Sequence, residues 1–200
     1  MAETSSRTLQ RIRLILWGAV VVVAVGATAL FLLRPPAAPL AVTGKPFALE
    51  STAGGSFTQD SLKGTPSLVF FGYTYCPDVC PTTLAESTIW KDELGLDNTT
   101  LRTIFVTVDP ERDTKDVLTQ YLSYYPGVIG LVGTPDQTEA AKASFGAMSE
   151  KTEPDESGFY LVNHTASVFL IDAEGRFEGT IAYGEAKDTA VAKIKKLLAS

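Results

Sequence analysis

A long apolar run near the N-terminus limits how this chain can fold more than any other feature. The run covers the twenty residues from Leu14 to Leu33 and contains no charged side chain. At the rise of an α-helix, a run of this length spans about 30 Å, which is the thickness of the hydrocarbon core of a bilayer. We therefore predict a transmembrane anchor over residues 14–33, followed by a separately folded part.

The residues around the run indicate its orientation and its processing. Three arginines lie within residues 1–13. Because the basic side of a span usually stays in the cytoplasm, residues 1–13 are expected to be cytoplasmic and everything after Pro35 to lie outside. The small residues Ala27-Thr28-Ala29 match a signal-peptide cleavage site, so a cleaved leader is the alternative. We expect an uncleaved anchor, since its length and flanks fit and cleavage there would leave apolar residues 30–33 exposed.

The remainder of the chain is predicted to form a short tether and one domain. Residues 34–43 are rich in Pro and Ala and offer little to pack, which predicts a semi-extended tether. Residues 44–200 are numerous enough for one domain with a proper hydrophobic core. The chain carries a net charge of −6. Without an excess of Lys and Arg to neutralise phosphates, nucleic acid is not an expected partner.

Strand-like and helix-like segments alternate through residues 44–200. The predicted strands are 67–73, 102–108, 128–132, 166–171 and 176–182, and the predicted helices are 81–94, 113–124, 135–148 and 186–199. Asp113 is predicted to be the N-cap of its helix. Alternation in the first half indicates parallel strands with crossover helices, and the turn at 172–175 indicates an antiparallel hairpin. The predicted fold class is α/β, a thioredoxin-like mixed sheet flanked by helices, preceded by one N-terminal transmembrane helix.

The two cysteines of the chain lie together where a predicted strand passes into a predicted helix. They are Cys76 and Cys80, within the segment Gly72–Pro81. A helix N-terminus lowers the pKa of a thiol and favours the thiolate, which is the form that binds metal or attacks disulfides. Dithiol oxidoreductases have two residues between their cysteines, whereas this chain has three. A spacing of four within one helical turn places both side chains on one face, where they can chelate an ion or close a readily reduced disulfide.

The chain's one histidine, His164, precedes the predicted strand 166–171. In thioredoxin-like proteins the segment entering this strand faces the cysteine loop and usually carries a cis-proline, but here Asn163-His164-Thr165 stands in that place. A lone histidine is about as often a structural residue as a ligand, and the sequence leaves both roles open.

Two thiolates and one imidazole form a soft, three-coordinate set. Thiolates select Cu(I), and imidazole also suits Cu(II), so copper is the predicted metal, with Cys76, Cys80 and His164 as its ligands. A closed four-ligand zinc site cannot be built from two cysteines and one histidine, although zinc with an open fourth position is chemically possible.

Three motifs together resemble the SCO/SenC family of copper chaperones. They are the run Tyr75–Pro81, the run Val108–Thr114 with the sequence VDPERDT, and His164 before a strand that ends in Leu-Ile-Asp. The likeness covers about residues 44–198 and the N-terminal anchor. One departure is Asn163, where the family usually has Asp. The loss of this charge is expected to leave the histidine a ligand.

The resemblance implies a thioredoxin fold, and copper bound by Cys76, Cys80 and His164, with Asp109 as an acidic residue near the metal. It further implies a metallochaperone, rather than an enzyme, that delivers copper to the copper-binding subunit of cytochrome c oxidase. Another copper chaperone would act as donor. The location implied by the anchor, without a long acid-poor transit peptide, is the periplasmic side of a bacterial cytoplasmic membrane.

Two other classes of function stay open from the sequence. Cys76 and Cys80 alone would suffice for a thiol-disulfide oxidoreductase that keeps the cysteines of the oxidase or of another copper protein reduced. A redox or copper sensor is the lesser alternative. Outside the cytosol the two thiols tend to form a disulfide, which cannot bind copper. A thioredoxin-like reductant is therefore an expected partner as well.

Overall fold

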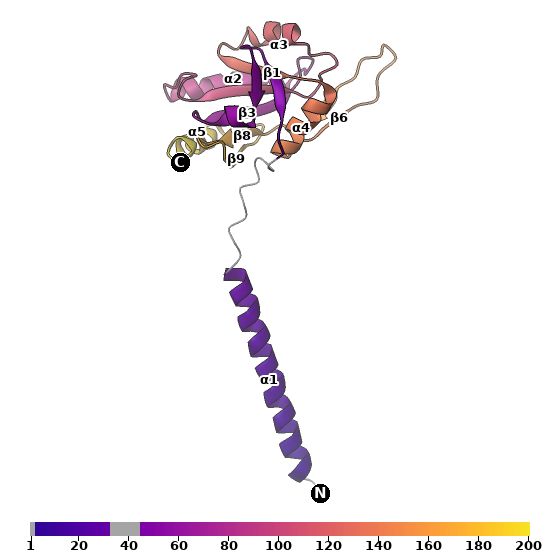
Figure 1. The fold of residues 1–200 in the computed structure, drawn as a ribbon, viewed down its shortest axis with the longest axis vertical. Coiled ribbons are helices and arrows are strands. Elements are labelled where there is room, and N and C mark those ends of the chain that lie inside the picture. Colours follow the sequence, from indigo (N-terminus) through magenta and orange to yellow (C-terminus); the bar gives the residue numbers. More distant parts are fainter. Residues whose placement is uncertain (1–2, 33–44) are drawn as a thin grey trace. The chain divides into compact units, whose positions relative to one another are not determined.

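The computed structural model describes residues 3–32 and 45–200 of the chain, which fall into two units. The first unit contains one helix, α1 (Glu3–Leu32), with an apolar stretch at Ile12–Ala29 that is long enough to cross a membrane. The predicted tether, residues 34–43, lies outside the described residues. The second unit contains every other element in Figure 1.

The second unit is built around a seven-stranded mixed sheet (Figure 1). In spatial order its strands are β2 (Ser56–Thr58), β1 (Ala48–Ser51), β5 (Val128–Val132), β4 (Arg102–Thr107), β3 (Ser67–Gly72), β8 (Val168–Ile171) and β9 (Phe177–Ile181). The central strands β3, β4 and β5 are parallel, and the outer strands pair antiparallel. A short 3-10 helix, Gln59–Leu62, follows β2. The predicted thioredoxin-like mixed sheet is thus confirmed.

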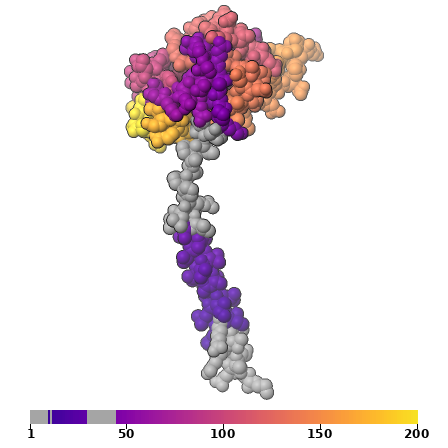
Figure 2. Space-filling view, in the orientation of Figure 1, coloured from indigo at the N-terminus to yellow at the C-terminus, as the bar shows by residue number. Residues whose placement is uncertain are grey.

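Four helices flank this sheet, as parallel strands require for their crossovers. They are α2 (Val79–Glu93), α3 (Lys115–Leu122), α4 (Pro135–Phe145) and α5 (Lys187–Leu198). A separate two-stranded ribbon is formed by β6 (Ser149–Lys151) and β7 (Val162–His164). The segment between its strands, residues 152–161, stands out from the body of the domain (Figures 1 and 2).

The strand β3 lies within the core, and its six residues are all buried. A strand that has neighbours on both edges and helices on both faces has no solvent side, which explains its continuous apolar sequence. The Phe71 ring meets Phe145 of α4 and Phe169 of β8 in edge-on contacts at 5.4 and 5.9 Å between centroids. These contacts hold the strand that carries the cysteine loop rigidly within the sheet.

All nine strands and helices predicted within residues 44–200 are present, with ends shifted by up to three residues. The missed elements are four short strands and the short 3-10 helix. The strands β1, β2, β6 and β7 have three or four residues each. Two local interpretations were wrong. The second helix begins at Val79, so Cys76 lies before it and the two cysteines do not share a helical face. The N-cap of α3 is Thr114, whose hydroxyl accepts a hydrogen bond from the backbone N–H of Val117.

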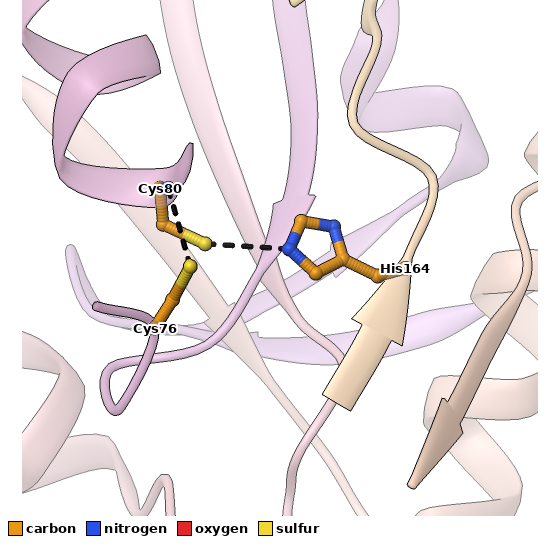
Figure 3. Close-up of side chains that lie close together, drawn as sticks. All are labelled: Cys76, Cys80 and His164. Atoms are coloured by element: carbon orange, nitrogen blue, oxygen red, sulfur yellow. Dashed lines mark hydrogen bonds between the residues drawn. The ribbon is translucent and has the colours of Figure 1, made fainter. Parts of the chain in front are cut away.

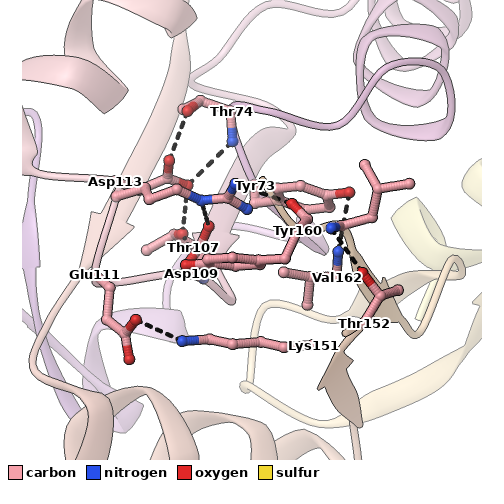
Figure 4. Close-up of polar contacts among 12 residues, drawn as sticks. Tyr73, Thr74, Thr107, Asp109, Glu111, Asp113, Lys151, Thr152, Tyr160 and Val162 are labelled. Carbon is pink, nitrogen blue, oxygen red and sulfur yellow. Dashed lines mark hydrogen bonds and ion pairs between the residues drawn. The ribbon is translucent and has the colours of Figure 1, made fainter. Parts of the chain in front are cut away.

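Asp113 has a different role from the predicted cap, because its carboxylate is fully buried. It accepts hydrogen bonds from the Thr74 backbone N–H at 3.1 Å and the Thr74 hydroxyl at 2.6 Å. The Thr107 hydroxyl at the end of β4 donates a third, at 2.6 Å (Figure 4). A buried carboxylate is tolerated only when donors surround it in this way. Asp113 therefore ties the start of the cysteine loop to the end of the neighbouring strand.

Replacing Asp113 with Ala should lower the free energy of unfolding by about 2 to 4 kcal/mol, because one buried and two partly buried donors lose their acceptor. Denaturant titration followed by circular dichroism measures this change. Asp116→Ala in the first turn of α3 is the matched control. Asp116 is exposed, so its loss should cost under about 0.5 kcal/mol. Equal costs for the two variants would contradict the structural role given to Asp113.

Candidate metal centre

The cysteines lie where β3 leaves the sheet and α2 begins. A tight turn follows Gly72, with the backbone N–H of Cys76 donating to the Tyr73 carbonyl at 3.2 Å. Cys76 is half-buried in this loop, and Cys80 is fully buried in the first turn of α2. The backbone N–H of Cys80 donates to the Cys76 sulfur at 3.3 Å (Figure 3). The free amides of a helix start are thus directed at the Cys76 thiol, as the sequence suggested.

The two thiols differ strongly in acidity. The hydrogen bond from the Cys80 side chain, more than any other contact, lowers the pKa of Cys76 to about 4, although partial burial opposes this. The same hydrogen bond, together with burial, raises the pKa of Cys80 above its ordinary value. The pair therefore holds one proton at neutral pH, with the negative charge on the more exposed sulfur.

The third side chain reaches the cysteines from the separate ribbon. His164 is the last residue of β7, paired across the ribbon with Ser149 of β6. Its Nδ1 lies 3.0 Å from the Thr165 carbonyl oxygen, and its Nε2 lies 3.5 Å from the Cys80 sulfur. A carbonyl can only accept, so Nδ1 carries the proton and donates it. The lone pair of Nε2 is left facing the sulfurs, the arrangement usual for a ligating histidine.

Two aromatic rings fix the plane of the imidazole. Phe70 and Tyr73 each meet the His164 ring edge-on, at 5.8 Å between centroids. The Tyr73 hydroxyl also accepts a hydrogen bond from the backbone N–H of Val162, at 3.2 Å. Because Tyr73 belongs to the cysteine loop, this bond joins the loop to the strand that carries the histidine.

The three side chains form a compact donor set. Their ligand atoms, the sulfurs of Cys76 and Cys80 and a ring nitrogen of His164, all lie within 4.8 Å of one another. Thiolate and imidazole ligands sit roughly 2.0 to 2.3 Å from a bound transition-metal ion, so one ion fits between them after a small contraction. A cavity of ≈ 270 Å³ opens beside Cys76 and His164, lined also by Pro77 and Leu161. The site can therefore be reached from solvent on one side.

Asp109 is buried near this site but makes its contacts elsewhere. Its carboxylate accepts a hydrogen bond from the Tyr160 hydroxyl at 2.9 Å (Figure 4). It also forms an ion pair with Arg112. It is not one of the three clustered side chains, so any effect on a metal passes through these partners. Neither Tyr73 nor Arg112 was among the site residues predicted from the sequence. The run VDPERDT that drew attention to Asp109 contains Arg112, but nothing in it shows that this arginine contacts the cysteine loop.

Comparison with known proteins matches residues 36–199 to the SCO1/SenC family model. The mitochondrial protein SCO2 of Saccharomyces cerevisiae is 36% identical over 156 residues, which are 76% of this chain and 52% of that protein. The chain thus spans about half the length of this curated relative.

Two solved structures share the fold of the domain. ScoI of Bradyrhizobium japonicum, solved with copper bound, has a TM-score of 0.69 and 39% identity over 76% of this chain and 97% of its own. BsSco, described as a member of the Sco family of cytochrome c oxidase assembly proteins with a disulfide switch, has a TM-score of 0.61. It is 25% identical over 80% of this chain and 96% of its own. With the family model, the curated relative and these folds in agreement, the chain belongs to the SCO1/SenC family.

Proposed function

We propose that this protein binds one copper ion through Cys76, Cys80 and His164. The observation that carries the proposal is the convergence of two sulfurs and one ring nitrogen within 4.8 Å. Two thiolates and an imidazole form a set that suits both Cu(I) and Cu(II). The copper-bound ScoI structure of Bradyrhizobium japonicum, which shares the fold, supports the choice of metal. Asp109 is proposed to act only indirectly, through Arg112 and Tyr160.

We further propose that the bound copper is cargo, delivered to the copper centre of cytochrome c oxidase. A three-coordinate ion next to an open cavity can accept a donor from a partner before it releases one of its own ligands. The description of the BsSco relative as an oxidase assembly protein supports this recipient. Another copper chaperone would load the site, and a thioredoxin-like reductant would keep both cysteines in the thiol form that binds metal.

The N-terminal helix is proposed to anchor the domain in a bacterial cytoplasmic membrane. The stretch Ile12–Ala29 is apolar and long enough to cross a bilayer. Arg7, Arg11 and Arg13 come before most of this stretch, so the positive-inside rule places the N-terminus in the cytoplasm and the copper domain on the periplasmic side. The cytoplasmic segment would then be residues 1–13, and the membrane span residues 14–33. The tether would be residues 34–43, and the copper domain residues 44–200.

Thiol-disulfide exchange is a second candidate, favoured by the unequal thiols. A cysteine with a pKa of about 4 is a thiolate at neutral pH and can attack a disulfide, and Cys80 can resolve the mixed disulfide. This chemistry does not use His164. The behaviour of a His164 variant therefore separates the two functions.

The full chain, reduced and purified in detergent, should bind one copper ion and show a thiolate-to-Cu(II) charge-transfer band. His164→Ala should alter or abolish the band and weaken binding by roughly 100-fold or more, because a ligand is lost. Absorption spectroscopy with metal analysis measures both. Disulfide reductase activity that survives unchanged in His164→Ala, with no copper bound by the wild type, would establish the oxidoreductase instead.

Met148→Leu is the matched control for this measurement. Met148 is exposed, and its backbone forms hydrogen bonds with Thr165, next to the histidine. Apart from the two cysteines, it is the one sulfur-bearing residue in the described part of the chain. Met148 lies just before β6, and its side chain is not one of the three clustered donors. The variant should retain the copper stoichiometry and the band.

The acidity of Cys76 predicts the pH dependence of its alkylation in the metal-free protein. Since its pKa is lowered to about 4, Cys76 should react with iodoacetamide at nearly full rate at pH 6, where an ordinary thiol is almost entirely protonated. Cys80→Ser weakens the main hydrogen bond that lowers this pKa and should shift the midpoint of the rate profile upward. A wild-type midpoint between pH 8 and 9 would contradict the proposed thiolate pair.

The proposed span predicts how the chain behaves in a membrane. The full chain should stay in the membrane fraction after alkaline carbonate extraction. Val22→Arg, near the middle of the stretch, should reduce insertion by an apparent cost of about 2.5 to 3.5 kcal/mol. Protease added outside intact spheroplasts should digest the copper domain, and full protection of that domain would refute the proposed orientation.

A further inference from the structure

Arg112 lies between the two segments that supply the metal ligands. Its guanidinium contacts four aromatic rings, two from the cysteine loop and two from the segment between β6 and β7. The distances from its central carbon to the ring centroids are 5.8 Å for Tyr73, 4.8 Å for Tyr75, 5.7 Å for Phe159 and 3.7 Å for Tyr160. Its Nη1 donates to the Tyr160 carbonyl at 2.9 Å, and its Nε pairs with Asp109.

These contacts are next to the ligands in the sequence. Tyr75 immediately precedes Cys76, and Tyr160 is four residues before His164. The ribbon that carries His164 shares no hydrogen-bonded ladder with the main sheet in the described part of the chain. Its position relative to the cysteines therefore depends on its short connection to β8 and on side-chain contacts across the gap between the two segments. Arg112 supplies such contacts to both segments at once.

The environment of Arg112 suits a guanidinium better than any other cation. The side chain is 18% exposed, and its Nη2 has no hydrogen-bond partner among the described residues. Four ring centroids lie within 5.8 Å of the guanidinium carbon, so cation–π attraction stabilises the buried cation, at about 0.5 to 2 kcal/mol for each favourable ring. A lysine would keep the charge beside Asp109, but it has no planar group to stack on several rings at once.

We propose that Arg112 is a positioning residue of the metal centre, which sets the distance between the histidine-bearing ribbon and the cysteine loop. It touches no ligand atom and acts through Tyr75 and Tyr160. The part of the inference that is tested by copper affinity rests on the proposed copper function. The position of His164 can be measured without metal.

A double-mutant cycle tests whether Arg112 acts through His164. In the full chain in detergent, Arg112→Lys should weaken Cu(I) binding roughly 10- to 100-fold, measured by competition with a chromophoric chelator, as is typical of groups that orient metal ligands. In the His164→Ala background the same substitution should cause little further loss, because the ligand it positions is gone. An equal loss in both backgrounds would overturn the proposal and make Arg112 a residue of general stability.

Arg102→Lys is the matched control, since Arg102 is a second partly buried arginine at the opposite end of β4. It donates to the carbonyls of Ser61, Leu62 and Thr65, far along the strand from the site. Its replacement should lower the thermal midpoint of unfolding but leave the copper affinity and the charge-transfer band unchanged. A band that shifts as much in Arg102→Lys as in Arg112→Lys would also overturn the proposal.

Proton NMR of the metal-free chain supplies the readout that does not involve copper. The protein has one histidine, so the ring Cε1–H signal is unambiguous after labelling with carbon-13. The edge-on rings of Phe70 and Tyr73 should displace this signal from its position in an unfolded chain. Arg112→Lys should move it back towards that position, whereas Arg102→Lys should not. If the signal does not move in Arg112→Lys, the positioning role is overturned. If the signals shift as expected but the wild type binds no copper, only the proposed function is overturned.

Discussion

The parallel pairing of β3 with β4 is the contact on which the geometry of the site depends. The two strands run in register from Ser67 opposite Arg102 to Gly72 opposite Thr107. Because parallel strands end at the same edge of a sheet, the cysteine loop and the loop after β4 leave the sheet side by side. The backbone N–H of Val108 then donates to the Gly72 carbonyl at 2.8 Å, which extends the pairing beyond the strands. Everything that shapes the site, from the Asp113 cluster to Arg112, lies on these two loops or touches them.

Gly72, at the end of β3, is also needed for the geometry of the site. A Cβ at position 72 would lie 2.8 Å from the Cys80 sulfur and equally close to the Phe105 ring. The absence of a side chain therefore lets Cys80 pack directly on the sheet, fully buried, where its proton is held against a nearby thiolate. Burial alone raises the pKa of a thiol and would make the pair inert. The hydrogen bond from the Cys80 thiol, followed by the helix-start amide that donates to Cys76, keeps the half-buried Cys76 sulfur reactive.

The sequence was informative where side-chain type and order along the chain decide the outcome. Apolar runs bounded by turns predicted β3, β4 and β5, and two cysteines at a strand-to-helix transition predicted the location of the site. The role of a residue was predicted poorly where a single contact with a residue distant in the sequence determines it. Asp is a residue type typical of helix N-caps, which is why Asp113 was predicted to be one. Its carboxylate instead accepts a hydrogen bond from Thr74, thirty-nine positions away in the sequence. The short strand that ends at His164 has no periodicity long enough to detect, and it exists because β6 pairs with it.

Under the proposed function, the two sulfurs meet an incoming partner in a defined order. Cys80 is sealed beneath the loop, whereas Cys76 and His164 line the cavity that opens to solvent. A donor that enters this cavity reaches the half-buried Cys76 thiolate and the His164 imidazole first, while Cys80 remains out of its reach. Ligand exchange can therefore proceed one bond at a time with the ion still held by the buried sulfur. The difference in exposure between the two sulfurs also makes Cys76 the attacking thiol in any disulfide exchange. The cysteine pair alone therefore does not separate copper delivery from disulfide exchange, whereas His164 does.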